Sequence, residues 1–163
     1  MSVITPEPIR IVPRTYTFVI KGKPWVQKNN LFIYYRNPRA KTGAFVGHSK
    51  DLGIARDSMS NELYLRYREQ GGRSPIDYPM DLFLVFYVER QHEPDLDNLP
   101  AIVCDAMQGI KVKGVKGARA SAIIVEDKLV RTIQTRKIVK GHIDYVGEPR
   151  TEITVSRSFY GLK

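Results

Sequence analysis

The sequence predicts an α+β fold in which a mixed β-sheet packs against two main helices. Leu82–Val88 reads Leu-Phe-Leu-Val-Phe-Tyr-Val, an unbroken apolar run that suits a central strand buried on both faces. Residues 49–70 and 98–108 each place apolar side chains on one helical face. The 163 residues are 42% hydrophobic and contain no Pro-, Ser- or Gly-rich divider, so we expect one domain over residues 1–163.

The segment ahead of the central strand predicts two strands and the first helix. Tyr16–Lys21 and Leu31–Tyr35 are rich in the aromatic and β-branched residues that strands favour. Ser49 is a suitable N-cap for a helix, and Gly71 with Gly72 ends its pattern. The residues that share the apolar face of this helix are Leu52, Ala55, Met59, Leu63 and Tyr67.

The second helix and two closing strands follow the central strand. The helical pattern runs from Asn98 to Gln108 and ends at Gly109. A stretch rich in Lys and Gly comes next and predicts a flexible loop, after which Ala122–Val125 extends toward an acidic pair. Val130–Lys140 and Thr151–Ser158 then predict the closing strands.

An acidic motif lies where the central strand gives way to the second helix. Asp95 and Asp97 are one residue apart, so in extended backbone both carboxylates leave the same face and can share one hard cation. A helix cap is the alternative, because Asp97 or Asn98 precedes the helix and Pro100 suits its first turn. Both interpretations remain open at this point.

Three further acids favour the cation over the cap. Asp105 lies within the second helix, and Glu126 with Asp127 precedes the strand that follows it. Carboxylates brought together without a partner raise one another's pKa and cost stability. A divalent cation would relieve that repulsion, which makes a metal site the sharper prediction.

The acids occur in an order that resembles a known family. Asp-Leu-Asp-Asn at 95–98 is followed by Asp-Ala-Met at 105–107 and by Val-Glu-Asp-Lys-Leu-Val at 125–130. This set is similar to the RusA family of Holliday junction resolvases. Weaker matches in the N-terminal part are Lys23-Pro24-Trp25, Asn29-Asn30, Tyr35-Arg36 and Ala55-Arg56, so the resemblance covers most of the chain.

The resemblance implies a RusA-like endonuclease that binds four-way DNA junctions as a homodimer and nicks two symmetric strands. Its catalytic and metal-binding aspartates fall on Asp95, Asp97 and Asp127, which would hold Mg2+, with Mn2+ as a substitute. Asn98, Asp105 and Glu126 are then outer ligands or alternative ligands. Water bound to the metal would attack the phosphodiester in line.

Two departures from the family pattern affect this site. Family members usually carry a lysine four residues after the second aspartate, where this chain has Ala101. An ammonium beside the metal would stabilise developing negative charge, so another lysine is expected to replace it. The second departure is an insertion between Gly109 and Val125. The candidate replacements are Lys111, Lys113 and Lys116 in that insertion, and Lys128 beside the third acid.

The charge distribution indicates a nucleic-acid partner. The chain has 26 basic and 17 acidic residues, for a formal net charge of +9. Nine of the basic residues and none of the acidic ones lie between Pro8 and Lys50. Such a field favours a polyanion through counterion release. The basic residues that we expect to contact branched DNA are Lys28, Arg36, Arg39, Lys41, Lys111, Lys113, Lys116 and Arg119.

Other features narrow the class of protein. The single cysteine, Cys104, excludes an intrachain disulfide, and the histidines at 48, 92 and 142 lack zinc spacing. His92 is a minor candidate for a proton shuttle. The apolar run at 82–88 is too short to span a membrane and no signal core precedes it, so we expect a cytoplasmic protein without a membrane segment. No small-molecule cofactor is indicated.

Two alternatives to the nuclease remain open from the sequence. One is a junction-binding or DNA-binding protein of the same fold whose cleavage is weakened or lost. It is favoured by Ala101, which stands where family members usually carry a lysine. The other is a metal-dependent phosphatase or nucleotide hydrolase, which the basic N-terminal segment argues against. Strong dependence of binding on salt would separate DNA from a small substrate.

Overall fold

Four strands form the central sheet in the order β1-β8-β4-β7. The computed structural model describes residues 15–24, 31–37, 39, 42–48, 50–90 and 94–158, with only the backbone described for most of 31–48. The sheet comprises β1 (Thr15–Lys21), β8 (Arg150–Arg157), β4 (Met80–Val88) and β7 (Val130–Val139). With two helices packed on this sheet, the predicted single-domain α+β class is confirmed.

The mixed character of the sheet comes from its last pair of strands. β4 runs antiparallel to β8 and parallel to β7. A parallel pair requires a crossover, and here α2 (Leu99–Met107) and a short hairpin provide it. The acidic motif leaves the carboxyl end of β4 and begins this crossover, so the fold places it at the edge of the sheet beside β7.

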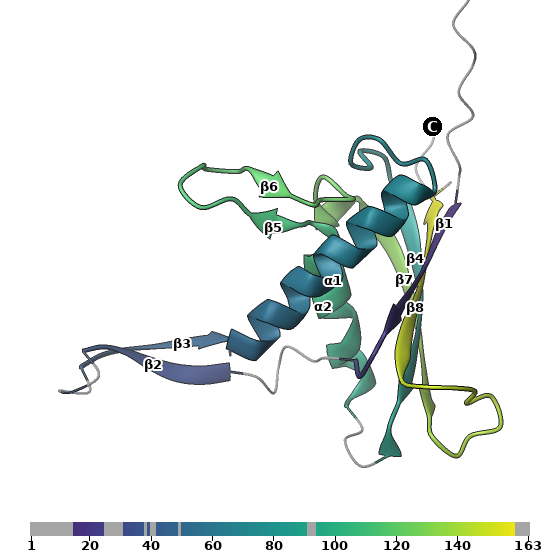
Figure 1. Cartoon of the computed structure of the whole chain (residues 1–163), viewed down its shortest axis with the longest axis horizontal. Coiled ribbons are helices and arrows are strands. Elements are labelled where there is room, and N and C mark those ends of the chain that lie inside the picture. Colours follow the sequence, from purple (N-terminus) through teal and green to yellow (C-terminus); the bar gives the residue numbers. More distant parts are fainter. Residues whose placement is uncertain are drawn as a thin grey trace, which may run out of the picture.

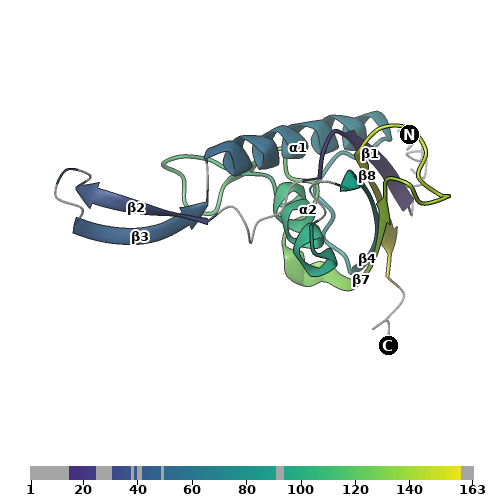
Figure 2. The same cartoon turned by 90° about the horizontal axis from the view of Figure 1, so that it is seen from below.

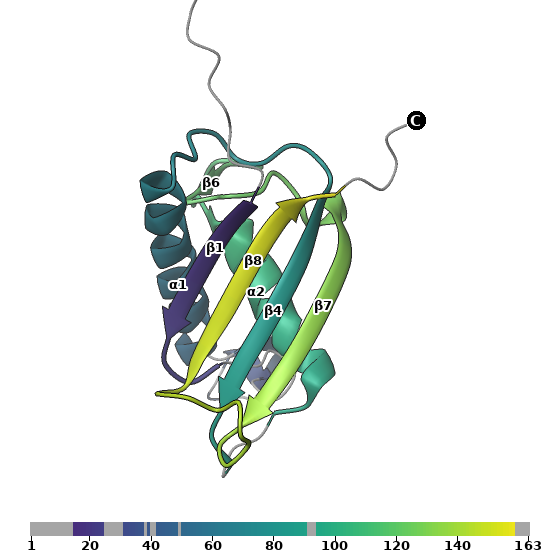
Figure 3. The ribbon, with the colours of Figure 1, turned by 90° about the vertical axis from the view of Figure 1, so that its right-hand side faces the viewer.

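Both helices cover the same face of the sheet, as Figures 2 and 3 show. α1 (Lys50–Glu69) packs against β1 and against α2. Apolar side chains from both helices and all four strands meet in one core between the layers. The predicted face of α1 is largely confirmed: Leu52, Met59, Leu63 and Tyr67 are buried, whereas Ala55 is half-buried.

The opposite face of the sheet is only partly covered. Val85 and Tyr87, each 9% exposed, pack there with Ile138 and Tyr145 in a second cluster, so the prediction that 82–88 is buried on both faces is wrong only at Phe83. Phe83 points to that face and is 46% exposed. Near the other end of the strand, Tyr87 is covered by Tyr145 and by the guanidinium of Arg150, which lies 3.5 Å from the ring centroid. The apolar run therefore reflects a central position in the sheet rather than a second layer of helices.

A hairpin of β2 (Leu31–Asn37) and β3 (Thr42–His48) projects away from the sheet and helices (Figures 1 and 2). The two strands pair antiparallel from Leu31 with His48 to Asn37 with Thr42. The strand predicted at Leu31–Tyr35 is confirmed, and β3 was missed. Its two glycines and short apolar stretch give a weak strand pattern.

The Lys/Gly-rich insertion is a second hairpin and not the flexible loop that the sequence predicts. β5 (Ile110–Lys111) pairs antiparallel with β6 (Arg119–Ala120). Gly109 enters it with a φ of 81°, and a Cβ atom there would lie 2.3 Å from the carbonyl oxygen of Ala120. Such a close backbone approach requires glycine. The base of this hairpin is therefore packed tightly against the end of α2.

Within the part of the chain that the structure describes, none of the helices has the length and apolar character needed to cross a membrane.

Candidate metal and DNA-binding site

The acidic motif lies on η2 (Leu96–Asn98), a short turn that joins the chain after β4 to α2. Asp95 and Asp97 are exposed, whereas Asn98 is only 7% exposed. The Nδ2 of Asn98 lies 3.5 Å from the Oδ2 of Asp95 and donates a long hydrogen bond to it. The buried side-chain amide of Asn98 therefore contacts the exposed carboxylate of Asp95.

The sequence left open whether Asp97 or Asn98 caps the second helix. Asn98 occupies the N-cap position, but its backbone is helical, with φ −90° and ψ −15°, and its side chain makes no capping hydrogen bond. The turn of η2 continues directly into α2, and Pro100 lies in the first turn as predicted. The amide of Asn98 thus serves Asp95 and not the helix end.

Of the remaining acids, Asp105 lies on α2, and Glu126 and Asp127 lie ahead of β7. Asp127 begins η3 (Asp127–Leu129), just ahead of β7, and is exposed. The pKa of the Cys104 thiol is raised to about 11. The largest cause is burial, and the nearby charges of Asp105 and Asp127 add to it. Both carboxylates therefore lie close to the C-terminal half of α2. Glu126 forms an ion pair of 2.8 Å with Lys128.

The carboxylates suit Mg2+ by their chemistry, but three of them do not meet in this structure. Within the described ranges, no group of three or more His, Cys, Asp or Glu side chains is placed to hold a metal ion. Asp95 and Asp97 lie just ahead of α2, and Asp105 lies in its last turn. Asp127 lies on a separate turn, η3, close enough to Cys104 for its charge to affect the thiol. The carboxylates as placed here therefore do not form a three-ligand metal site.

None of the four lysines suggested by the sequence is placed beside Asp95 and Asp97. Lys111, Lys113 and Lys116 lie on the exposed β5–β6 hairpin, and Lys128 is paired with Glu126. The structure instead brings Lys137 of β7 to the motif, where its Nζ donates a hydrogen bond of 3.0 Å to the carbonyl oxygen of Pro94. Sequence reasoning missed this lysine because it requires the parallel pairing of β4 with β7.

The basic residues expected to contact DNA lie mainly on the two hairpins. Arg39 is exposed in the turn between β2 and β3, and Arg36 belongs to β2, where only the backbone is described. Lys28, Lys41 and His92 lie outside the described residues, as does Trp25. The basic residues of the β5–β6 hairpin are all exposed: Lys111, Lys113, Lys116 and Arg119.

A polar hollow joins the base of the β5–β6 hairpin to Asp105 on α2. Arg56 of α1, Lys111 and Arg119 line it together with Asp105 and Gln108. The guanidinium of Arg119 donates hydrogen bonds of 3.3 Å to the Gly109 carbonyl and 3.5 Å to the Gln108 side chain, and that of Arg56 pairs with Asp57 at 2.8 Å. Three basic side chains from separate segments therefore line the same hollow as one of the predicted acids.

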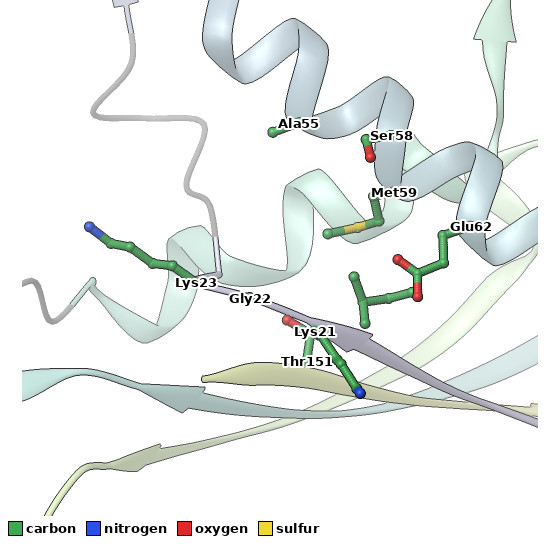
Figure 4. Close-up of a pocket in the computed structure, with 9 residues that line it drawn as sticks. Lys21, Gly22, Lys23, Ala55, Ser58, Met59, Glu62 and Thr151 are labelled. Carbon is green, nitrogen blue, oxygen red and sulfur yellow. The ribbon is translucent and has the colours of Figure 1, made fainter. Parts of the chain in front are cut away.

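A second hollow lies between the end of β1 and α1 (Figure 4). Met59 and Ile20 contribute apolar surface to it, and Glu62 contributes a carboxylate that is paired with Arg66 at 2.8 Å. Lys21 and Lys23 also line it, and in Figure 4 their side chains extend in different directions. Its lining thus lacks the convergent positive charge that a phosphate would require.

The sequence matches no protein-family model, and a comparison with curated proteins finds no significant match.

Proposed function

We propose that this protein is a Mg2+-dependent, structure-selective endonuclease that resolves four-way DNA junctions by paired symmetric nicks. The observation that carries the proposal is the placing of one acid of the ordered set among basic side chains: Asp105 lines a hollow together with Arg56, Lys111 and Arg119. Acids that act on DNA need such cations, because a phosphate would otherwise be repelled. The ordered acidic set that resembles the RusA family supports the same class.

Hairpin placement supports a DNA partner. β2–β3 and β5–β6 both project on the side of the sheet that carries the helices (Figures 1 and 2). The first includes part of the acid-free basic segment, and the second has basic residues at 111, 113, 116 and 119 with no acid between them. Two basic projections flanking the helices would contact the phosphates of separate DNA arms.

The proposed chemistry assigns separate tasks to these residues. A bound Mg2+ would supply an activated water and neutralise charge on the scissile phosphate. The ligands that the resemblance implies are Asp95, Asp97 and Asp127. These three do not form a metal-binding group in the structure, so metal binding would have to bring them together. Asn98 donates a long hydrogen bond to the Asp95 carboxylate. The cations of the hollow would hold the phosphate backbone near the acids.

Symmetric nicking requires two sites, so we extend the proposal to a homodimer with a two-fold axis. Cleavage of opposite strands by one monomer would require dissociation and rebinding between cuts. Sedimentation of the protein alone and bound to a junction tests this part of the proposal. A monomer under both conditions would contradict it.

A second candidate is a protein that binds junctions but has weakened or lost cleavage. Two observations favour it: Ala101 replaces the family lysine, and no group of three metal-ligating side chains occurs among the residues that the structure describes. It shares the DNA-binding surfaces with the first candidate. Only a cleavage assay distinguishes the two.

The assay uses purified protein with labelled four-way junction, flap and linear duplex DNA, in Mg2+, Mn2+ or EDTA. The endonuclease proposal expects symmetric cuts in the junction with either metal and none in EDTA. Tight junction binding without cuts in either metal would support the binding protein instead. Hydrolysis of small phosphate esters without junction binding would contradict both.

A further inference from the structure

We propose that Lys137 takes over the task of the lysine that is absent at Ala101, an inference that rests on the function proposed above. In this role Lys137 is a positioning residue: it holds the segment that carries Asp95 and Asp97 and supplies positive charge beside it. Its Nζ donates a hydrogen bond of 3.0 Å to the carbonyl oxygen of Pro94, the residue that immediately precedes Asp95.

The parallel pairing of β7 with β4 explains how Lys137 reaches the motif. Lys137 is opposite Phe86, which is 1% exposed and belongs to the core beneath the helices. Opposed residues in a sheet share a face, so the side chain of Lys137 rises on the face that carries α2. It does so near the carboxyl end of β4, from which the acidic motif departs.

The neighbours of Lys137 have other tasks. Arg136 and Ile138 alternate to the opposite face, where Arg136 pairs with Asp144 and Ile138 is buried beside Tyr87. Lys140 follows the strand and pairs with Glu89 at 3.2 Å. Of the basic residues at 136, 137 and 140, the one bonded to the segment that leads into the acids is Lys137.

Lys137 lies where salt screens its positive charge only partly. Its side chain is half-buried, and its hydrogen bond to Pro94 joins residues 43 positions apart in the sequence. Partly buried charges are screened less by salt than exposed ones. An ammonium held at Pro94, next to the segment that carries the two aspartates, adds attraction for a DNA phosphate there. The exposed lysines of the β5–β6 hairpin lack such an anchor.

The test compares Lys137→Met, which removes the charge and the hydrogen bond, with Lys137→Arg, which keeps both. Lys140→Met is the matched control, since it removes a lysine from the same end of β7. Hydrogen–deuterium exchange of the peptide that covers residues 94–99 is measured together with junction cleavage in Mg2+. Thermal unfolding confirms that each variant is folded.

We expect exchange at 94–99 to become at least tenfold faster in Lys137→Met, and cleavage to become at least 100-fold slower. Lys137→Arg should recover most of both properties, and Lys140→Met should resemble the wild-type protein. Unchanged exchange in a folded Lys137→Met variant overturns the inference, as does equal loss in Lys140→Met. If Lys137→Met does not fold, exchange in Lys137→Arg decides: protection at 94–99 close to wild type supports the inference, and protection lost there overturns it.

The exchange measurement separates this inference from the proposed function. If the wild-type protein cuts no junction in Mg2+ or Mn2+, the endonuclease proposal fails. Exchange at 94–99 still shows whether Lys137 positions the acidic segment. If the wild-type protein cuts and Lys137→Met cuts at the same rate, the function stands and the role of Lys137 is overturned.

Discussion

The amide of Asn98 and the carboxylate of Asp95 are joined by a hydrogen bond of 3.5 Å, donated from a residue that is 7% exposed. The pair ties the exposed acidic motif to the core, because Asn98 sits directly ahead of the buried Leu99. The way Asp95 is presented to solvent therefore depends on a side chain that solvent hardly reaches.

Asn98→Ala removes this hydrogen bond while leaving the acids in place. We expect a loss of about 1 kcal/mol in the free energy of unfolding, the usual net value of one hydrogen bond. Junction cleavage should fall roughly 10- to 100-fold, as for other groups that orient metal ligands. Asn61→Ala is the control, since Asn61 accepts a hydrogen bond from Ser121 on the exposed side of α1. Equal cleavage by both variants would contradict the role of Asn98.

Asp97→Asn tests the acid at the centre of the motif. The proposed metal site predicts that cleavage of a synthetic four-way junction is lost, because an amide is a poor replacement for a charged ligand. Binding should remain nearly intact or tighten, since one negative charge is removed from the DNA-binding side. Asp77→Asn, at an exposed loop position, is the matched control. A variant that still cuts at the wild-type rate would rule out the site.

Arg36→Ala combined with Lys41→Ala tests the basic segment around the β2–β3 hairpin. Loss of two phosphate contacts should weaken junction binding in low salt. It should also reduce the slope of log affinity against log salt concentration by about two. The control combines Arg66→Ala with Lys140→Ala, two cations that are paired with Glu62 and Glu89. Unchanged affinity in a gel-shift assay would show that this hairpin faces away from the DNA.

Gly109→Ala tests the base of the β5–β6 hairpin. The new methyl group would overlap the carbonyl oxygen of Ala120 at 2.3 Å and would force a side chain into a φ of 81°. We expect a loss of about 3 kcal/mol in the free energy of unfolding, measured by urea denaturation. Gly114→Ala separates the two effects, because its φ is 82° with nothing within 4 Å, and should cost only about 1 kcal/mol. Similar losses in both variants would contradict the packing argument.

The raised pKa of Cys104 gives a pH test of where Asp127 lies. A thiol with a pKa of about 11 in the folded protein and 9.0 when unfolded holds its proton more tightly in the folded state. Its contribution to stability is present below pH 9 and is lost as the pH rises through 11, by up to about 3 kcal/mol.

Asp127→Asn should lower this pKa, because it removes one of the negative charges that disfavour the thiolate. Thiolate absorbance in the ultraviolet, followed against pH, measures the change. Asp77→Asn should leave the titration where it is in the wild-type protein. If Asp127→Asn also leaves it unchanged, Asp127 does not lie beside α2.

Local patterns in the sequence predicted most of the fold. The apolar run at 82–88 and the helical spacing of 99–107 report directly on burial, so β4 and α2 were found with nearly correct bounds. The exposure of Phe83 was missed, because a run that is apolar at every position does not tell how far each side is covered. β3 was missed because glycine at two of its seven positions weakens the strand pattern.

The acids of the candidate site remain a prediction from the sequence. Their spacing was interpreted in extended backbone, but only Asp95 is extended, and Asp97 lies in the 3-10 turn η2 that follows it. The contact of Lys137 with Pro94 depends on the register between β4 and β7, and strand pairing over 43 positions leaves no local signal. The distance between Asp127 and the first two acids likewise depends on the path of the crossover.

Titration of Mg2+ into the protein by calorimetry tests most directly whether the acids share a cation. The account predicts binding to the wild-type protein that is lost in Asp95→Asn and also in Asp127→Asn, because both side chains would be ligands of one site. Wild-type affinity in Asp127→Asn, or no binding by the wild-type protein with and without junction DNA, would contradict the proposed metal site.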